Sequence, residues 1–155
     1  MDDWIEHFQE AAKGLAIAYV WRGYGSSLFI EFGELTPATS TRKDGTPRAP
    51  SGEIGLMILN DWRIEDQCTI ACGSSSDEEL WEPTFARLVG KHVITVATFR
   101  RLPEVLISLS NGLQIASFST LDGDPQWTLF DRRGFSEITV SCRLGVITEQ
   151  HAESA

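Results

Sequence analysis

The chain has 155 residues, of which 42% are hydrophobic and 23% charged, and its formal net charge is −9. This length and composition predict one globular domain and do not favour a disordered chain. No run of about 18 apolar residues is present, and the acidic start lacks the basic and apolar parts of a secretory signal. We therefore expect a cytoplasmic protein without a membrane span.

The first residues have the pattern of a short amphipathic helix. Asp3 as the N-cap and Glu6 three residues later form a capping box. The apolar side chains of one helical face are Trp4, Ile5, Phe8, Ala11 and Ala12. Gly14 is a typical residue at the end of a helix. A helix over about ten residues is therefore expected here.

Strand-like runs follow this helix. Alternating or continuous apolar residues occupy 15–21, 28–32, 52–58, 62–64 and 69–73. The segment 36–51 is rich in Pro, Thr, Ser, Gly and Arg and has no periodicity. We expect this segment to be a mobile, mildly basic loop between two strands.

A second helical pattern begins near residue 76. Ser76 and Glu79 have capping-box spacing, and apolar residues recur at helical spacing up to Gly90. Pro83 lies inside this pattern and removes a helix donor. Either the helix kinks at Pro83, or residues 76–82 form one turn and a second helix begins at Pro83.

A second set of strand-like runs follows, in the same order as the first. These runs occupy 91–99, 105–109, 112–118, 127–129 and 138–146. Asn111-Gly112 separates two of them and is a strong signal for an antiparallel hairpin. Trp62 and Trp127 hold equivalent places in the two sets, which predicts a pair of core anchors.

The repeated order predicts an α+β fold of two pseudo-symmetric units, about 1–75 and 76–150, within a single domain over residues 1–150. Each unit would hold one helix and about four antiparallel strands. The alternative is that two runs of alternating apolar residues align loosely by chance. Residues 151–155 are expected to form a disordered tail.

Catalytic and metal-binding patterns are missing from the sequence. No Cys-x-x-Cys or His-x-x-x-His spacing is present, so we expect neither a metal nor another cofactor. The thiols of Cys68, Cys72 and Cys142 are expected to pack as small apolar groups. No glycine-flanked serine resembles a nucleophile elbow. The chain is therefore predicted not to be an enzyme.

Two pairs of carboxylates are the remaining candidates for acid–base chemistry. Glu31 and Glu34 follow an apolar run, and the alternation places Glu31 on the face opposite Ile30, towards solvent. Asp122 and Asp124 flank a glycine and are typical turn formers. Surface and turn roles are therefore the favoured interpretation for both pairs.

Negative charge is concentrated in residues 61–82, which contain seven acidic residues and only one basic residue, Arg63. Residues 91–155, in contrast, hold seven acidic and six basic residues. Such an asymmetry steers a protein towards a basic partner and away from nucleic acid or an anionic membrane. The alternative is that these charges only keep the domain soluble.

The order of elements along most of the chain resembles small bacterial immunity proteins of contact-dependent growth inhibition and related polymorphic toxin systems. The likeness is carried by Trp62-Arg63-Ile64-Glu65, the strand ending Cys72-Gly73, the helix ending Leu88-Val89-Gly90-Lys91, the run 103–113 and Pro125-Gln126-Trp127-Thr128-Leu129. The resemblance implies a protein that binds and inhibits a secreted nuclease toxin. It also implies a Whirly-like fold with a pseudo-twofold axis.

The expected partner is therefore a basic protein, and the expected binding residues are acidic. They are Asp61, Glu65, Asp66, Asp77, Glu78, Glu79 and Glu82, with Glu31 and Glu34 as weaker candidates. The loop 36–51 could make the contact instead. This interpretation requires the carboxylates to share one surface without being neutralised by the chain's own arginines.

The alternative function is binding of single-stranded nucleic acid, as Whirly proteins do, through exposed tryptophans. A net charge of −9 opposes this, because such a chain repels phosphates.

Overall fold

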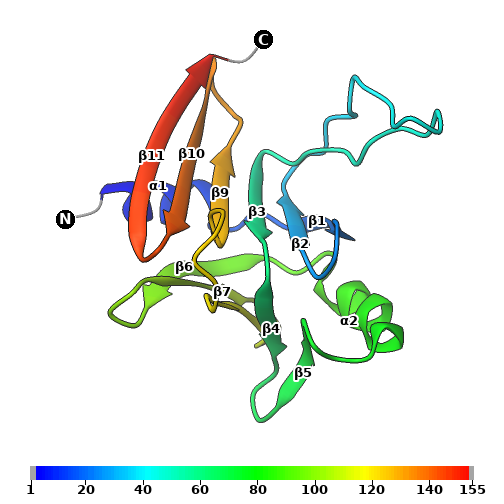
Figure 1. Ribbon diagram of the computed structural model, residues 1–155, viewed down its shortest axis with the longest axis vertical. Helices are drawn as coiled ribbons and strands as arrows, with labels where there is room; N and C mark the ends of the chain where they lie inside the picture. Colours follow the sequence, from blue (N-terminus) through cyan, green and yellow to red (C-terminus); the bar gives the residue numbers. More distant parts are fainter. Residues whose placement is uncertain (1–2, 154–155) are drawn as a thin grey trace.

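The computed structural model describes residues 3–153, which form two antiparallel sheets and two short helices (Figure 1). The elements are α1 (Asp3–Ala12), β1 (Ile17–Arg22), β2 (Leu28–Phe32), β3 (Ile54–Ile58), β4 (Asp61–Glu65), β5 (Ile70–Gly73), the 3₁₀ turn η1 (Glu78–Leu80), α2 (Trp81–Leu88), β6 (Val93–Phe99), β7 (Glu104–Leu109), β8 (Gln114–Phe118), β9 (Trp127–Asp131), β10 (Ser136–Arg143) and β11 (Val146–Glu153). The predicted α+β class with antiparallel strands is confirmed. Within residues 3–153, no helix is both long and apolar enough to cross a bilayer.

Each sheet takes strands from both halves of the chain. The six-stranded sheet has the order β1-β2-β3-β9-β10-β11, and the five-stranded sheet has the order β5-β4-β8-β7-β6. The first three strands of each half pair in sequence, and the next two cross to the sheet begun by the other half. The halves are thus interleaved, and neither forms its sheet without the other.

Backbone hydrogen bonds join the two halves where each helix ends. They run from Gly14 N to Val93 O (2.9 Å), Gly90 N to Ile17 O (2.8 Å), Ile17 N to Lys91 O (2.8 Å) and Val93 N to Leu15 O (2.9 Å). The bonds form two matched pairs. The bond from Gly14 corresponds to the one from Gly90, and the bond from Ile17 corresponds to the one from Val93, with the two halves of the chain exchanged. Gly14 and Gly90 have φ values of 82° and 87°, a left-handed conformation that glycine adopts without steric cost. The predicted helix stop at Gly14 is therefore correct.

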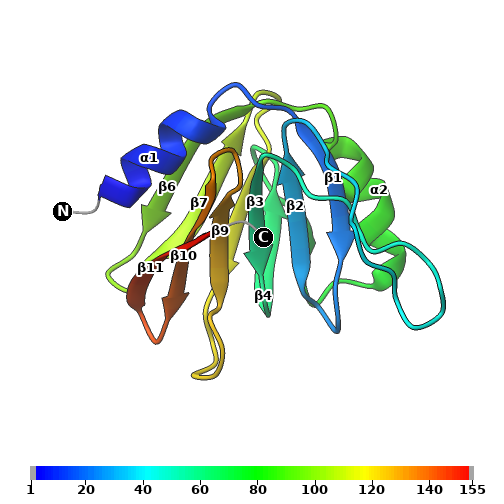
Figure 2. The same ribbon diagram turned by 90° about the horizontal axis from the view of Figure 1, so that it is seen from above.

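The core lies between the sheets, and the helices close its two ends (Figure 2). Helix α1 packs against β6 and β9, and α2 packs against β1 and β5. Trp4 of α1 contacts Trp127 with 5.7 Å between ring centroids, and Trp81 of α2 contacts Trp62 with 5.2 Å. All four rings are buried, so the prediction of Trp62 and Trp127 as core anchors is confirmed.

The second helical segment differs in detail from its prediction. The Ser76 hydroxyl accepts a hydrogen bond from Gly73 N, so the predicted capping box with Glu79 is wrong. Asp77 precedes η1 instead, and α2 begins at Trp81. Pro83 is the third residue of α2 and causes no break, because amides of the first turn have no acceptor within the helix.

The C-terminal segment is a strand, not a tail. β11 continues to Glu153 and pairs with β10 along its whole length. A two-residue turn at Leu144 and Gly145 makes this pairing local in the sequence. The predicted disorder is therefore wrong for residues 151–153, and residues 154–155 lie outside the described part of the chain.

Candidate functional site

We define the acidic edge as residues 61–82, which form β4, the edge strand β5, η1 and the start of α2 (Figure 1). It borders the five-stranded sheet, and α2 packs against both β5 and η1. The seven predicted acidic residues of this segment therefore lie on neighbouring elements. They differ, however, in what each carboxylate contacts.

Two of the carboxylates are neutralised by arginines of the same chain. Arg63 Nε donates to Glu65 Oε2, and Arg22 Nη2 donates to Glu78 Oε1 at 2.8 Å. The hydrogen bond and charge of Arg22 lower the pKa of Glu78. Glu65 and Glu78 therefore contribute little net charge to a partner, which corrects their role in the predicted surface.

Asp61 and Asp66 hold the local backbone and loops. Asp61 Oδ2 accepts a hydrogen bond from the Thr120 hydroxyl, which ties β4 to the loop after β8. Asp66 Oδ1 accepts from the amides of Cys68 (3.0 Å) and Thr69 (2.8 Å), and these bonds lower the pKa of Asp66. Both residues are half-buried and have structural roles of their own.

Asp77, Glu79 and Glu82 are different. All three are exposed, and within residues 3–153 their carboxylates make no hydrogen bond or ion pair. Asp77 precedes η1, Glu79 lies within it, and Glu82 is the second residue of α2. Three unpaired carboxylates therefore lie within six residues of the chain. The predicted binding surface requires carboxylates that the chain's own arginines do not neutralise. Asp77, Glu79 and Glu82 meet this requirement.

An apolar depression of about 430 Å³ lies on the acidic edge. Its lining includes Trp62, Ile70 and Phe118, and charged Asp61 and Arg63 flank it. Ile70 is 58% exposed. An apolar centre with a charged rim is the usual arrangement of a protein-binding surface.

Sequence reasoning missed two exposed apolar side chains of this edge, Ile70 and Leu80, which are 58% and 48% exposed. The alternation of Ile70 with Cys72 predicts a buried side chain for Ile70. The pairing of β4 with β5 is irregular between Ile64 and Glu65, and Ile70 lies opposite Glu65 on the outer side. No residue pattern signals this irregularity. Cys68, predicted to pack inside, is likewise exposed in the turn before β5.

Glu31 is buried, which overturns its assignment as a solvent-facing binding residue. Glu31 is 3% exposed, and its carboxylate pairs with Arg132 at 3.0 Å. Trp21 Nε1 and Gly52 N also donate to it, each at 3.1 Å. Arg132 reaches Glu31 over Gly55, where a Cβ atom would lie only 2.8 Å from Nη1. Glu31 therefore holds the six-stranded sheet together.

Glu34 is exposed but lies after β2, on the sheet that does not carry the acidic edge. Its amide donates to Glu53 Oε2 at 2.8 Å. The structure thus does not bring Glu31 or Glu34 to the predicted surface.

The remaining candidates for chemistry are the cysteines and the pair Asp122 and Asp124. Cys72 and Cys142 are buried, and burial raises the pKa of the Cys142 thiol, so it is a poor nucleophile. In the described residues, no three His, Cys, Asp or Glu side chains are arranged to hold a metal ion. Asp122 and Asp124 are exposed in the loop before β9.

Comparison with protein-family models, with curated proteins and with solved structures gives no significant match to this chain.

Proposed function

We propose that this protein is an immunity-type inhibitor that binds a basic nuclease toxin domain through its acidic edge. The observation that carries the proposal is the group of free carboxylates of Asp77, Glu79 and Glu82 on the same acidic edge as the exposed Ile70 and Leu80. These acidic side chains would take the positions that RNA phosphates occupy on the toxin. The apolar depression supplies the centre of the contact.

Electrostatics explains why such a surface suits an inhibitor. Complementary charge accelerates association, to about 10⁸–10⁹ M⁻¹s⁻¹ at low salt, and a toxin must be captured before it acts. The apolar centre lowers the dissociation rate, because its burial removes water from the depression and from the exposed Ile70 in its lining.

The internal symmetry of the fold also supports the proposal. The two strand orders correspond when β1 to β5 are exchanged with β6 to β10, and the hydrogen bonds at Gly14 and Gly90 exchange in the same way. We infer a duplicated, Whirly-like fold from this correspondence. The net charge of −9 favours a protein partner over nucleic acid on such a fold.

The test uses a basic nuclease toxin domain, which is sought first in the gene that neighbours the one encoding this chain. Cells that express it with the wild-type chain should grow, and cells with the charge reversal E79K/E82K should not. In calorimetry the reversal should weaken binding about 100-fold, since two opposed charges meet a cationic surface. The matched control is E6K/E10K on α1, where both acidic residues are exposed.

The control should protect cells as well as the wild-type chain. Equal protection by E79K/E82K would show that the acidic edge is not the binding surface.

A second candidate function is single-stranded nucleic-acid binding, and one observation favours it. Trp21 is half-buried, stacks on Phe29 with 3.9 Å between centroids, and lines a hollow of about 410 Å³ with Arg22, Arg42 and Arg48. The other four tryptophans are buried and cannot stack on bases. Gel shifts of single-stranded RNA and DNA at low salt, repeated with R42Q/R48Q, test this function, and absence of any shift removes it.

A further inference from the structure

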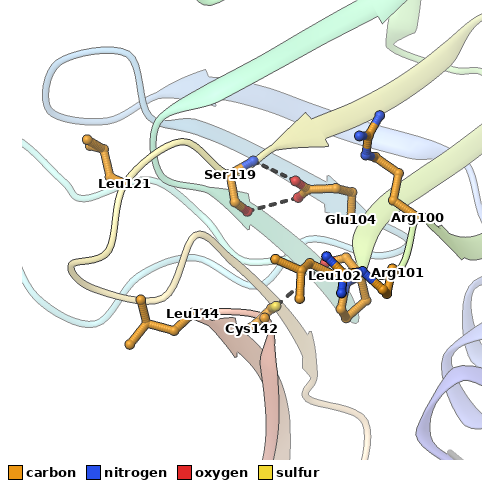
Figure 3. Close-up of a pocket in the computed structure, with 10 residues that line it drawn as sticks. Arg100, Arg101, Leu102, Glu104, Ser119, Leu121, Cys142 and Leu144 are labelled. Carbon is orange, nitrogen blue, oxygen red and sulfur yellow. Dashed lines mark hydrogen bonds between the residues drawn. The ribbon is translucent and has the colours of Figure 1, made fainter.

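Three turns meet around a hollow of about 580 Å³ that the sequence analysis did not single out (Figure 3). The turns connect β6 to β7, β8 to β9 and β10 to β11. Residues from all three line the hollow. Its volume is within the roughly 300–1,000 Å³ that is usual for pockets that bind small molecules.

Part of the wall of the hollow is apolar and open to solvent. Leu102, Leu121 and Leu144 each come from a different turn, and they are 59%, 57% and 61% exposed. Three leucines exposed at one place are unusual for turns, which favour polar residues. They offer a surface for an apolar ligand.

Positive charge lies at one side of this surface. Arg100 and Arg101 line the hollow, and within residues 3–153 neither guanidinium forms an ion pair. The nearby carboxylate of Glu104 is held instead by the hydroxyl of Ser117 (2.9 Å) and by the amide and hydroxyl of Ser119 (2.6 and 2.9 Å). The hollow therefore carries two cations and one satisfied anion, in a chain whose net charge is −9.

The backbone is strained at two residues that line the hollow. In the described residues, Arg100 (φ 70°) and Leu144 (φ 54°) are the two non-glycine residues with positive φ. Leu144 and Gly145 form a two-residue hairpin turn in which asparagine followed by glycine is preferred. Leucine has no local hydrogen bond to offset this conformation, and its side chain is not buried in the core.

Strained residues of this kind tend to gather at functional sites. Because packing does not explain Leu144, its exposed side chain at the hollow calls for another role. The same holds for Arg100, whose side chain is exposed as well.

We propose that this hollow binds a small anion with an apolar body, of the class of aliphatic carboxylates. The carboxylate contacts Arg100 and Arg101, and the apolar body lies against Leu102, Leu121 and Leu144. Guanidinium groups suit this headgroup, because they bind carboxylates through paired hydrogen bonds. The site is separate from the free carboxylates near η1 and does not depend on the proposed function.

Calorimetry with the full chain tests the site with two ligands that share this chemistry. One is octanoate, with octanol as its uncharged counterpart. The other is the peptide acetyl-Ala-Leu-Leu with a free carboxyl terminus, with its amide as counterpart. We expect one of the two carboxylates to bind at least tenfold more tightly than its counterpart, and which one binds identifies a free acid or a peptide terminus as the source.

Substitutions place the binding in this hollow. R101Q should remove the preference for the carboxylate, whereas R87Q, a matched change of an exposed arginine on α2, should leave it unchanged. L144N should weaken binding at least fivefold while raising the unfolding temperature by about 2–4 °C, because asparagine relieves the strain of the turn. A misfolded variant would show the opposite change in temperature.

The proposal is overturned if neither carboxylate binds, if the uncharged counterparts bind equally well, or if R101Q and L144N bind like the wild-type chain.

Discussion

Glu31 and Arg132, which are 101 residues apart in the sequence, form an ion pair with 3.0 Å between Oε1 and Nη1. The pair spans the place where β3 of the first half meets β9 of the second half. Its carboxylate is almost fully buried, whereas the guanidinium is 24% exposed. The pair therefore helps to join the two halves in one sheet.

Removing this arginine should destabilise the protein. In R132M, Glu31 stays buried and keeps only the hydrogen bonds from Trp21 and Gly52. We expect a loss of about 2–3 kcal/mol in the free energy of unfolding, measured with urea. The double variant E31Q/R132M should recover part of this loss, because no buried charge remains. A loss as large in the double variant would show that packing, not charge, is responsible.

Trp62 and Trp127 should be equally sensitive to substitution. The indole of Trp62 donates to Ser26 O at 2.6 Å, and that of Trp127 donates to Pro103 O at 3.1 Å. Replacing either ring with phenylalanine removes the indole hydrogen bond and shrinks the core contact. We expect each change to cost about 1–3 kcal/mol in unfolding experiments. Y24F is the control, since Tyr24 is 99% exposed and should cost nothing measurable.

Acid should weaken the contact between α1 and the six-stranded sheet. Burial raises the pKa of Asp131, but the hydrogen bonds from Arg133 and His7 outweigh it and lower the pKa to about 2. The pKa of Asp131 in the folded protein is below its ordinary value of 3.8. At a pH between about 2 and 3.8, Asp131 is therefore protonated more often in the unfolded state than in the folded state. Asp131 therefore stabilises the protein by about 2 kcal/mol above pH 4, and this is lost as the pH falls from about 4 to 2.

The variant D131N checks this dependence on pH. Its unfolding free energy should be lower than that of the wild-type chain at pH 7, and the two should converge towards pH 2. Parallel curves over this range would show that another group controls acid stability.

Binding to the proposed toxin partner should depend on salt. Exposed charges are screened over about 10 Å at 0.1 M and 3 Å at 1 M ionic strength. We expect the association rate in stopped-flow experiments to fall at least tenfold between these salt concentrations, with a much smaller change in the dissociation rate. The variant E79K/E82K should lose most of this dependence. A rate that does not change with salt would contradict electrostatic docking.

Local patterns were sufficient to predict most elements. Apolar alternation located ten of the strands to within a few residues, because the two-residue period belongs to each strand alone. Asn111-Gly112 marked the turn between β7 and β8, where Gly112 has a φ of 83° and Asn111 accepts from Leu113 N. Strand β11 was missed, because its residues after Ile147 are polar or small and it is an edge strand.

Contacts between distant residues decided the site. Glu31 and Glu65 have similar places in the sequence pattern, since each alternates with buried residues, yet one is buried beside Arg132 and the other is paired with Arg63 at the surface. Glu78 is neutralised by Arg22, 56 residues away. Charge counting along the chain cannot predict the pairs of Glu31 and Glu78, because they depend on which elements become neighbours.

The sequence by itself determined the class of fold, the positions of the helices and the excess of negative charge near residues 61–82. These properties follow from local periodicity and composition. Only the tertiary structure decided that β4 and β9 exchange sheets and that Asp77, Glu79 and Glu82 alone among the predicted acidic residues of that segment have no partner in the described chain. Sheet order and ion pairing are set by contacts across long stretches of sequence, which no local pattern records.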